Sequence, residues 1–110
     1  MTGRYRLALL ALATAITASG ASAQDAAIIA EGRALLEERC SRCHAIDREG
    51  NSPHPEAPAF RTLSERYPVS ALQESLAEGI VTGHPDMPEF TAEPVQIAAI
   101  IAYLESIQSH

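Results

Sequence analysis

Apolar residues recur every three or four positions in two long stretches of the chain, a spacing that places them on one face of a helix. The first series consists of Ile29, Gly32, Leu35, Leu36 and Cys40. Asp25 is expected to cap this helix, which should end between Cys40 and His44. The second series consists of Ile97, Ile100, Ile101, Leu104 and Ile107. It follows Pro94, and proline is favoured at the first position of a helix.

A short helix is also expected in the middle of the chain. Phe60, Leu63 and Tyr67 follow Pro58 at helical spacing. Pro68 should end this helix, because proline disfavours helical geometry in the residue before it.

A fourth helix is expected from Ser70 to Gly79. Ser70 and Gln73 have the spacing of a capping box, and glycine is favoured just past the end of a helix. Segments 45–57 and 80–91 are rich in proline, glycine and polar residues, so they should be loops. No stretch alternates polar and apolar residues for long enough to form a strand. The sequence therefore predicts an all-α fold of about four short helices.

The first 23 residues have the pattern of a secretory signal. Arg4 and Arg6 precede the apolar run 7–18, and the small residues 21–23 supply the positions that a signal peptidase reads. The apolar run is shorter than the ~20 residues needed to cross a bilayer. Cleavage after Ala23 is therefore favoured over an uncleaved membrane anchor, which leaves an exported working domain of residues 24–110.

Composition narrows the function. Aspartate and glutamate number 14 against 8 basic residues, all of them arginine, and the net charge of −6 becomes −8 once Arg4 and Arg6 are removed. General nucleic-acid binding is excluded, because it relies on clustered cations that neutralise phosphates. In a domain this small, a core built only from side chains gives marginal stability. A stabilising cross-link, metal or large apolar cofactor is therefore expected.

Residues 40–44 (CSRCH) identify that cofactor. Two cysteines separated by two residues, with a histidine directly after the second, form the attachment signature of c-type haem. Cys40 and Cys43 would add to the two vinyl groups of one porphyrin as thioether anchors. His44 would then lie under the iron as its proximal ligand.

Other uses of two cysteines fit less well. A structural zinc site needs four ligands, and the histidines at 44, 54, 84 and 110 have no recognisable zinc spacing. A thioredoxin-like dithiol requires a βαβ context that the pattern lacks. A disulfide between Cys40 and Cys43 would close a very small loop and stabilise the fold little.

Met87 is the candidate for the second axial ligand of the iron. It is the one methionine of residues 24–110, and it lies in a polar loop between Pro85 and Pro88, a poor location for a core residue. A thioether ligand favours reduced iron and raises the potential relative to two histidines. His84 is the competing ligand. It is interpreted, with His54 and His110, as a solvated surface histidine.

Together these features resemble a small bacterial class I cytochrome c. Gly32 and Leu36 stand eight and four residues before Cys40, as that family places a glycine and a bulky apolar residue. Residues 100–104 (IIAYL) resemble its C-terminal helix, in which an aromatic such as Tyr103 packs against the first helix at the glycine. The 43-residue separation of His44 and Met87 fits the short-chain members. The resemblance covers nearly all of residues 25–107 and implies loops wrapped around one covalent haem, with the N- and C-terminal helices crossing.

The sequence departs from the family after the haem motif. The family has a Gly-Pro pair there, and its proline carbonyl accepts a hydrogen bond from the outer nitrogen of the proximal histidine, which orients the ring. Here the nearest equivalent is Ala57-Pro58, and Pro53 and Pro55 are rival candidates. We favour Pro58, because Phe60 follows it on the expected helix.

The resemblance implies a periplasmic electron carrier, with no substrate bond made or broken, that is monomeric when free. A dedicated haem subunit of a larger oxidoreductase is the main alternative, and a haem sensor or peroxidase with a labile Met87 is a third. Because the chain is acidic and lacks lysine, its redox partners should dock through a basic surface or through short-range contacts at the haem edge.

Overall fold

A computed structural model describes residues 19–81 and 84–109 of the chain. These described residues form five helical elements. These are the α-helices α1 (Ser19–Arg39), α2 (Leu72–Glu78) and α3 (Pro94–Ile107) and the 3-10 helices η1 (Phe60–Glu65) and η2 (Val69–Ala71). Within the described residues the one β-type contact is an isolated antiparallel bridge between Ile80 and Phe90. The all-α prediction is confirmed.

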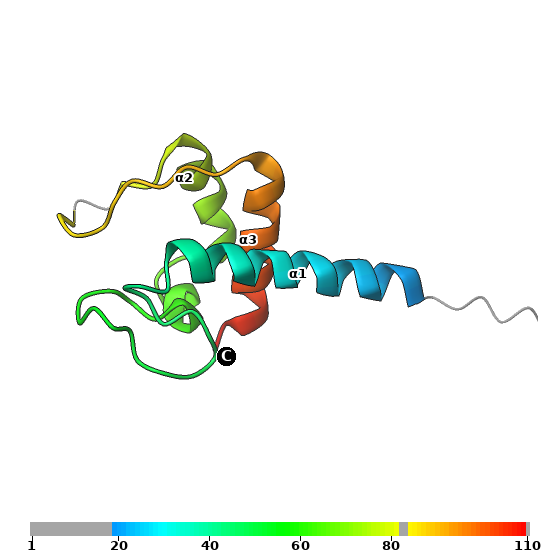
Figure 1. Cartoon of the computed structure of the whole chain (residues 1–110), viewed down its shortest axis with the longest axis horizontal. Coiled ribbons are helices and arrows are strands. Elements are labelled where there is room, and N and C mark those ends of the chain that lie inside the picture. The colour runs from blue at the N-terminus through cyan, green and yellow to red at the C-terminus, as the bar shows by residue number, and fades with distance from the viewer. Residues whose placement is uncertain (1–18, 82–83, 110) are drawn as a thin grey trace, which may run out of the picture.

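The crossing of α1 and α3 forms the centre of the molecule (Figure 1). Gly32 lies at this crossing, where a Cβ atom would overlap the carbonyl oxygen of Ala99 and come within 3.0 Å of the Tyr103 Cβ. Any side chain at position 32 would therefore push the two helices apart. This close approach confirms the expected contact of the N- and C-terminal helices and gives Gly32 its packing role.

The core lies on the face of α3 that the apolar spacing predicts. Ile97, Ile100, Ile101, Leu104 and Ile107 are all buried. The members of the same apolar cluster that lie outside α3 are Leu36, Ile46, Phe60, Leu63, Val69, Leu76 and Ala92. Burial of each large aliphatic side chain contributes about 1.5–3 kcal/mol, so the packing of α3 against the other helices is the main source of stability.

The expected start of the first helix is wrong. α1 begins at Ser19, so Asp25 lies inside the helix rather than at its cap. Ala23 and Gln24, which have high helix propensity, precede Asp25 and favour continuation of the helix on its N-terminal side. Residues 1–18 of the expected secretory signal lie outside the described part of the chain. Within that part, no helix is both long and apolar enough to cross a membrane.

The expected capping box of Ser70 and Gln73 is also wrong. Ser70 lies inside η2, and neither η2 nor α2 has a side-chain cap. The capping box belongs instead to α3, where the Glu93 and Gln96 side chains each bond the other's backbone N–H. The helix expected after Pro58 is the 3-10 helix η1, which ends two residues before Tyr67.

Two loops extend beyond the C-terminal end of α1, on the side away from its N-terminal end (Figure 1). Residues 40–59 connect α1 to η1, and residues 79–93 connect α2 to α3. Gly79 ends α2 with a φ of 105°, a conformation that L side chains rarely adopt. The bridge between Ile80 and Phe90 then closes the second loop at its base, with the Ile80 N–H donating to the Phe90 carbonyl at 2.9 Å.

A polar contact fastens the first loop to the helix crossing. Arg33 of α1 donates to both carboxylate oxygens of Asp47, at 3.1 and 3.2 Å. The Tyr103 hydroxyl of α3 lies 2.8 Å from the Ile46 carbonyl oxygen and 3.0 Å from Asp47. The chain just after His44 is therefore held to both long helices.

Candidate functional site

The end of α1 presents Cys40, Cys43 and His44 at one place. Hydrogen-bonded turns continue past the last helical residue, with the Cys43 and His44 N–H groups donating to the Cys40 carbonyl at 3.2 and 2.9 Å. Both thiols are free and half-buried. The turns therefore hold two sulfurs and an imidazole close together on a fixed backbone.

Contacts on two sides orient the His44 ring. Its Nδ1 lies 2.8 Å from the Pro58 carbonyl oxygen, and its ring centroid lies 4.6 Å from that of Phe60. A carbonyl can only accept a hydrogen bond, so Nδ1 carries the proton and donates it. In the neutral ring, Nε2 is then left with a free lone pair, which is the form that binds a metal.

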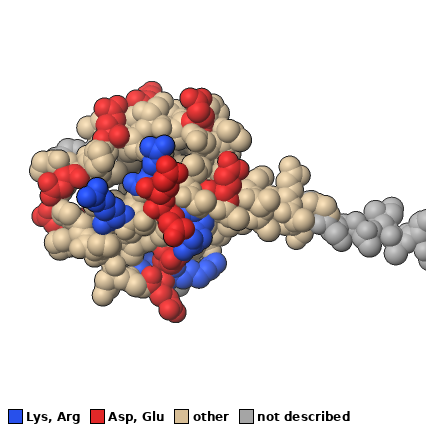
Figure 2. Space-filling model, viewed as in Figure 1, with Lys and Arg blue, Asp and Glu red and all other residues tan. Residues whose placement is uncertain are grey.

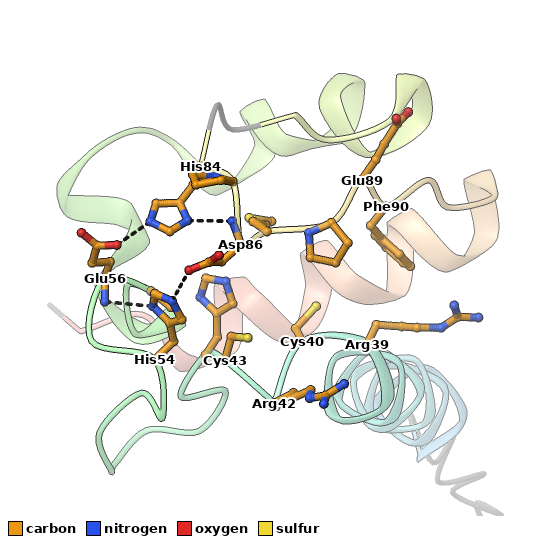
Figure 3. Close-up of a pocket in the computed structure, with 15 residues that line it drawn as sticks. Arg39, Cys40, Arg42, Cys43, His54, Glu56, His84, Asp86, Glu89 and Phe90 are labelled. Carbon is orange, nitrogen blue, oxygen red and sulfur yellow. Dashed lines mark hydrogen bonds and ion pairs between the residues drawn. The ribbon is translucent and has the colours of Figure 1, made fainter.

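These residues face a cavity of about 690 Å³ between the two loops. The volume is within the range of small-molecule and cofactor sites, about 300–1,000 Å³. Cys40, Cys43 and His44 line it from the end of α1, and Met87 lines it from the second loop. The structure thus brings four of the five expected site residues to one cavity, and Pro58 contacts one of them. In Figure 3 the Cys40 side chain points into the space between the loops.

The environment of Cys40 disfavours the charged form of its side chain. Burial raises its pKa to about 11, an effect that exceeds the opposing influence of Arg39. At the far end of the cavity the Arg39 guanidinium lies 5.8 Å from the centre of the Phe90 ring, an arrangement typical of a cation–π contact. Within the described residues, no three His, Cys, Asp or Glu side chains form a group that could hold a metal ion.

The interpretation of His54 and His84 as solvated histidines is wrong. Both are half-buried and line the cavity. His54 Nε2 lies 3.1 Å from an Asp86 carboxylate oxygen, and His84 Nε2 lies 2.6 Å from a Glu56 carboxylate oxygen. We call His54, Glu56, His84 and Asp86 the interloop cluster, since each pair joins the two loops (Figure 3). His110 lies outside the described residues.

A sequence signal for the interloop cluster exists in the chain. His54-Pro55-Glu56 and His84-Pro85-Asp86 are two copies of a histidine-proline-acid tripeptide, one in each loop. Such a short repeat shows a likeness between the two loops, but it does not show that they meet. Their pairing depends on the fold.

Comparison with known proteins agrees with this geometry. The sequence profile of the family described as "Cytochrome c" matches residues 29–108. A "Cytochrome c-553-like" protein of Synechocystis sp. (strain ATCC 27184 / PCC 6803 / Kazusa) is 28% identical over 76 residues, which cover 69% of this chain. The match spans 66% of that relative's length, just under two thirds. No solved structure matches the chain significantly.

Proposed function

Because this chain belongs to the cytochrome c family, whose members are electron carriers rather than enzymes, we propose that it carries single electrons between redox proteins through one covalently bound haem c. The observation that supports this proposal is the meeting of Cys40, Cys43, His44 and Met87 at one cavity. The haem would supply the redox chemistry, with its iron alternating between the ferrous and ferric states.

The residues around the cavity fit such a group. Cys40 and Cys43 lie one turn apart at the end of α1, where their sulfurs would form the two thioether bonds. His44 has an available Nε2 lone pair, because Nδ1 donates to Pro58. That contact would also keep the imidazole from rotating and increase its basicity as a ligand.

Met87 would supply the sixth ligand from the opposite loop. Its thioether sulfur is a soft donor that favours reduced iron and raises the potential. The flanking prolines restrict the backbone on both sides, so less conformational entropy is lost when the sulfur is held in place. With both axial positions filled by protein, the site would suit electron transfer rather than the binding of oxygen or peroxide, which needs an open position.

The charge of the molecule suggests the kind of partner. Acidic side chains are spread around the face shown in Figure 2, and the arginines lie nearer its middle. The net charge of −8 that remains once Arg4 and Arg6 are removed would steer the protein toward partners with a basic docking surface. We place it in the periplasm, as a monomer when free, after cleavage of the signal behind Ala23.

A potentiometric titration tests the proposed function. The full chain is exported from cells that carry haem-attachment machinery, and the absorbance of the purified product is followed against potential. We expect one transition with the slope of a one-electron couple, about 59 mV per tenfold change in the oxidised-to-reduced ratio. Absence of a reversible transition would contradict the proposal. The mass of the exported product reports whether cleavage occurs after Ala23.

A haem subunit of a larger oxidoreductase is the second candidate, because it requires the same ligands and the same cavity. Purification from the native periplasm distinguishes the two. A free carrier elutes at the size of a monomer, whereas a subunit elutes with one catalytic partner in a fixed ratio.

A further inference from the structure

The two histidine-proline-acid tripeptides pair with each other reciprocally. The histidine of each copy contacts the acid of the other: His54 reaches Asp86 at 3.1 Å, and His84 reaches Glu56 at 2.6 Å. The two imidazole rings meet edge to face, with centroids 5.4 Å apart. The pairing therefore joins loop 40–59 to loop 79–93 through two separate contacts at the cavity, as Figure 3 shows.

Backbone contacts within each tripeptide fix the direction of these hydrogen bonds. The Glu56 N–H donates to His54 Nδ1 at 3.1 Å, and the Asp86 N–H lies 3.3 Å from His84 Nδ1. Because Nδ1 accepts in both rings, the proton of each neutral ring is on Nε2. Each Nε2–H therefore donates to a carboxylate of the other loop, and neither contact requires a charged imidazole.

The interloop cluster is connected by backbone hydrogen bonds to the residues that would hold the haem. The Met87 N–H donates to the His84 carbonyl at 3.2 Å, and the His54 N–H donates to the Cys43 carbonyl at 3.1 Å. One half of the cluster thus belongs to the turn that carries Met87. The other half is bonded to the turn that carries Cys43 and His44.

We propose that the interloop cluster positions Met87, by holding its turn across the cavity from His44. The inference rests on the proposed function, in which Met87 is the sixth ligand. All four members of the cluster are positioning residues, since none of them would touch the iron. Without the two contacts, the Met87 turn would still be tethered at the Ile80–Phe90 bridge, but its tip would be free to move away from the first loop.

The two contacts are individually weak. The carboxylates of Glu56 and Asp86 are 68% and 64% exposed, and their histidine partners are 34% and 25% exposed. An exposed pair of this kind changes the equilibrium constant between the held and the released Met87 turn by about fivefold at most. Because both contacts order the same two loops, the entropy lost in fixing the loops is shared between them. The cluster can therefore bias the position of Met87 without making it immobile.

The test changes only the loop that does not carry Met87. Variants Glu56→Ala and His54→Ala/Glu56→Ala remove one and both contacts, and Glu56→Gln keeps an oxygen that can accept from His84. Glu49→Ala removes an exposed acid of the same loop and is the matched control. The measurements are the far-red sulfur-to-iron band of the oxidised protein and the carbon monoxide affinity of the reduced protein, which rises when Met87 leaves the iron.

We expect carbon monoxide affinity to rise about two- to fivefold in Glu56→Ala and further in the double variant, with a weaker far-red band in each. Glu56→Gln should restore most of the wild-type behaviour, and Glu49→Ala should match the wild type. If the wild type shows the band but both alanine variants keep it and bind carbon monoxide within twofold of the wild type, the positioning role is wrong. A wild-type spectrum without the band would instead remove Met87 as a ligand, and with it both the proposed ligation and this inference.

Discussion

The closest approach of the two long helices depends on one residue, Gly32. In an isolated helix alanine is favoured over glycine by about 1 kcal/mol. At position 32 this preference is reversed, because the added Cβ would lie 2.6 Å from the Ala99 carbonyl carbon and overlap its oxygen. Backbone atoms of α3 cannot rotate away as a flexible side chain could.

We therefore predict that Gly32→Ala lowers the free energy of unfolding of the haem-loaded protein by about 2–3 kcal/mol. Urea denaturation followed by far-UV circular dichroism measures this change. Ala30→Gly, at an exposed position of the same helix, is the control and should lose about 1 kcal/mol through helix propensity alone. A Gly32→Ala variant as stable as the wild type would mean that the helices do not cross as closely as described.

Single residues could be assigned from sequence where the motif itself fixes their neighbours. Cys40, Cys43 and His44 all lie within a five-residue signature, so their proximity follows from chain connectivity. The proline that contacts His44 could not be chosen from sequence in this way. Pro53, Pro55 and Pro58 are all close enough to His44 along the chain for a loop to bring any of them to its ring. The contact with Pro58 depends on how residues 45–57 fold back onto η1.

At the level of elements, the contact of Asp47 with Arg33 and Tyr103 connects the first loop to α1 and α3. Hydrogen bonds from Arg33, and then from Tyr103, lower the pKa of Asp47 below its usual value. A carboxyl whose pKa is lower in the folded state stabilises the fold above its unfolded pKa of about 3.9. This contribution is lost as the pH falls through the folded pKa.

We predict that Asp47→Asn is less stable than the wild type by about 0.5–1 kcal/mol at pH 7, a modest value because the carboxyl is 52% exposed. The difference should shrink as the pH falls below about 4, where the wild-type carboxyl becomes protonated. Denaturation curves at pH 7 and pH 3 for both proteins measure it. An equal difference at the two pH values would show that the charge of Asp47 contributes nothing.

The long helices could be predicted from sequence better than their ends. The apolar spacing of α3 extends over most of its length, and burial of that apolar face contributes most of the free energy that stabilises the helix. Helix ends depend on weaker local interactions, which residue spacing alone does not determine. Ser70 and Gln73 have the spacing of a capping box, but the structure forms one at Glu93 and Gln96. Similarly, α1 does not start at Asp25, because the alanine and glutamine residues just before it also favour a helix.

At the level of the whole molecule, the cavity is a product of two loops that are far apart in sequence. Proline and glycine content predicts that residues 45–57 and 80–91 are loops, but it does not predict their separation or their mutual contacts. The sequence therefore does not predict the interloop cluster, since the two histidine-proline-acid tripeptides show that the loops are alike but not that they meet. The long-range pairing of His54 with Asp86 and of His84 with Glu56 requires the folded structure.

The visible spectrum of the exported full chain, recorded in both oxidation states after purification under denaturing and native conditions, tests the central claim most directly. We predict covalently retained haem with the sharp reduced-state bands of a c-type cytochrome and the weak far-red band when oxidised. These features would establish Cys40, Cys43, His44 and Met87 in their proposed roles. Absence of covalently bound haem from a chain with intact Cys40 and Cys43 would contradict the account.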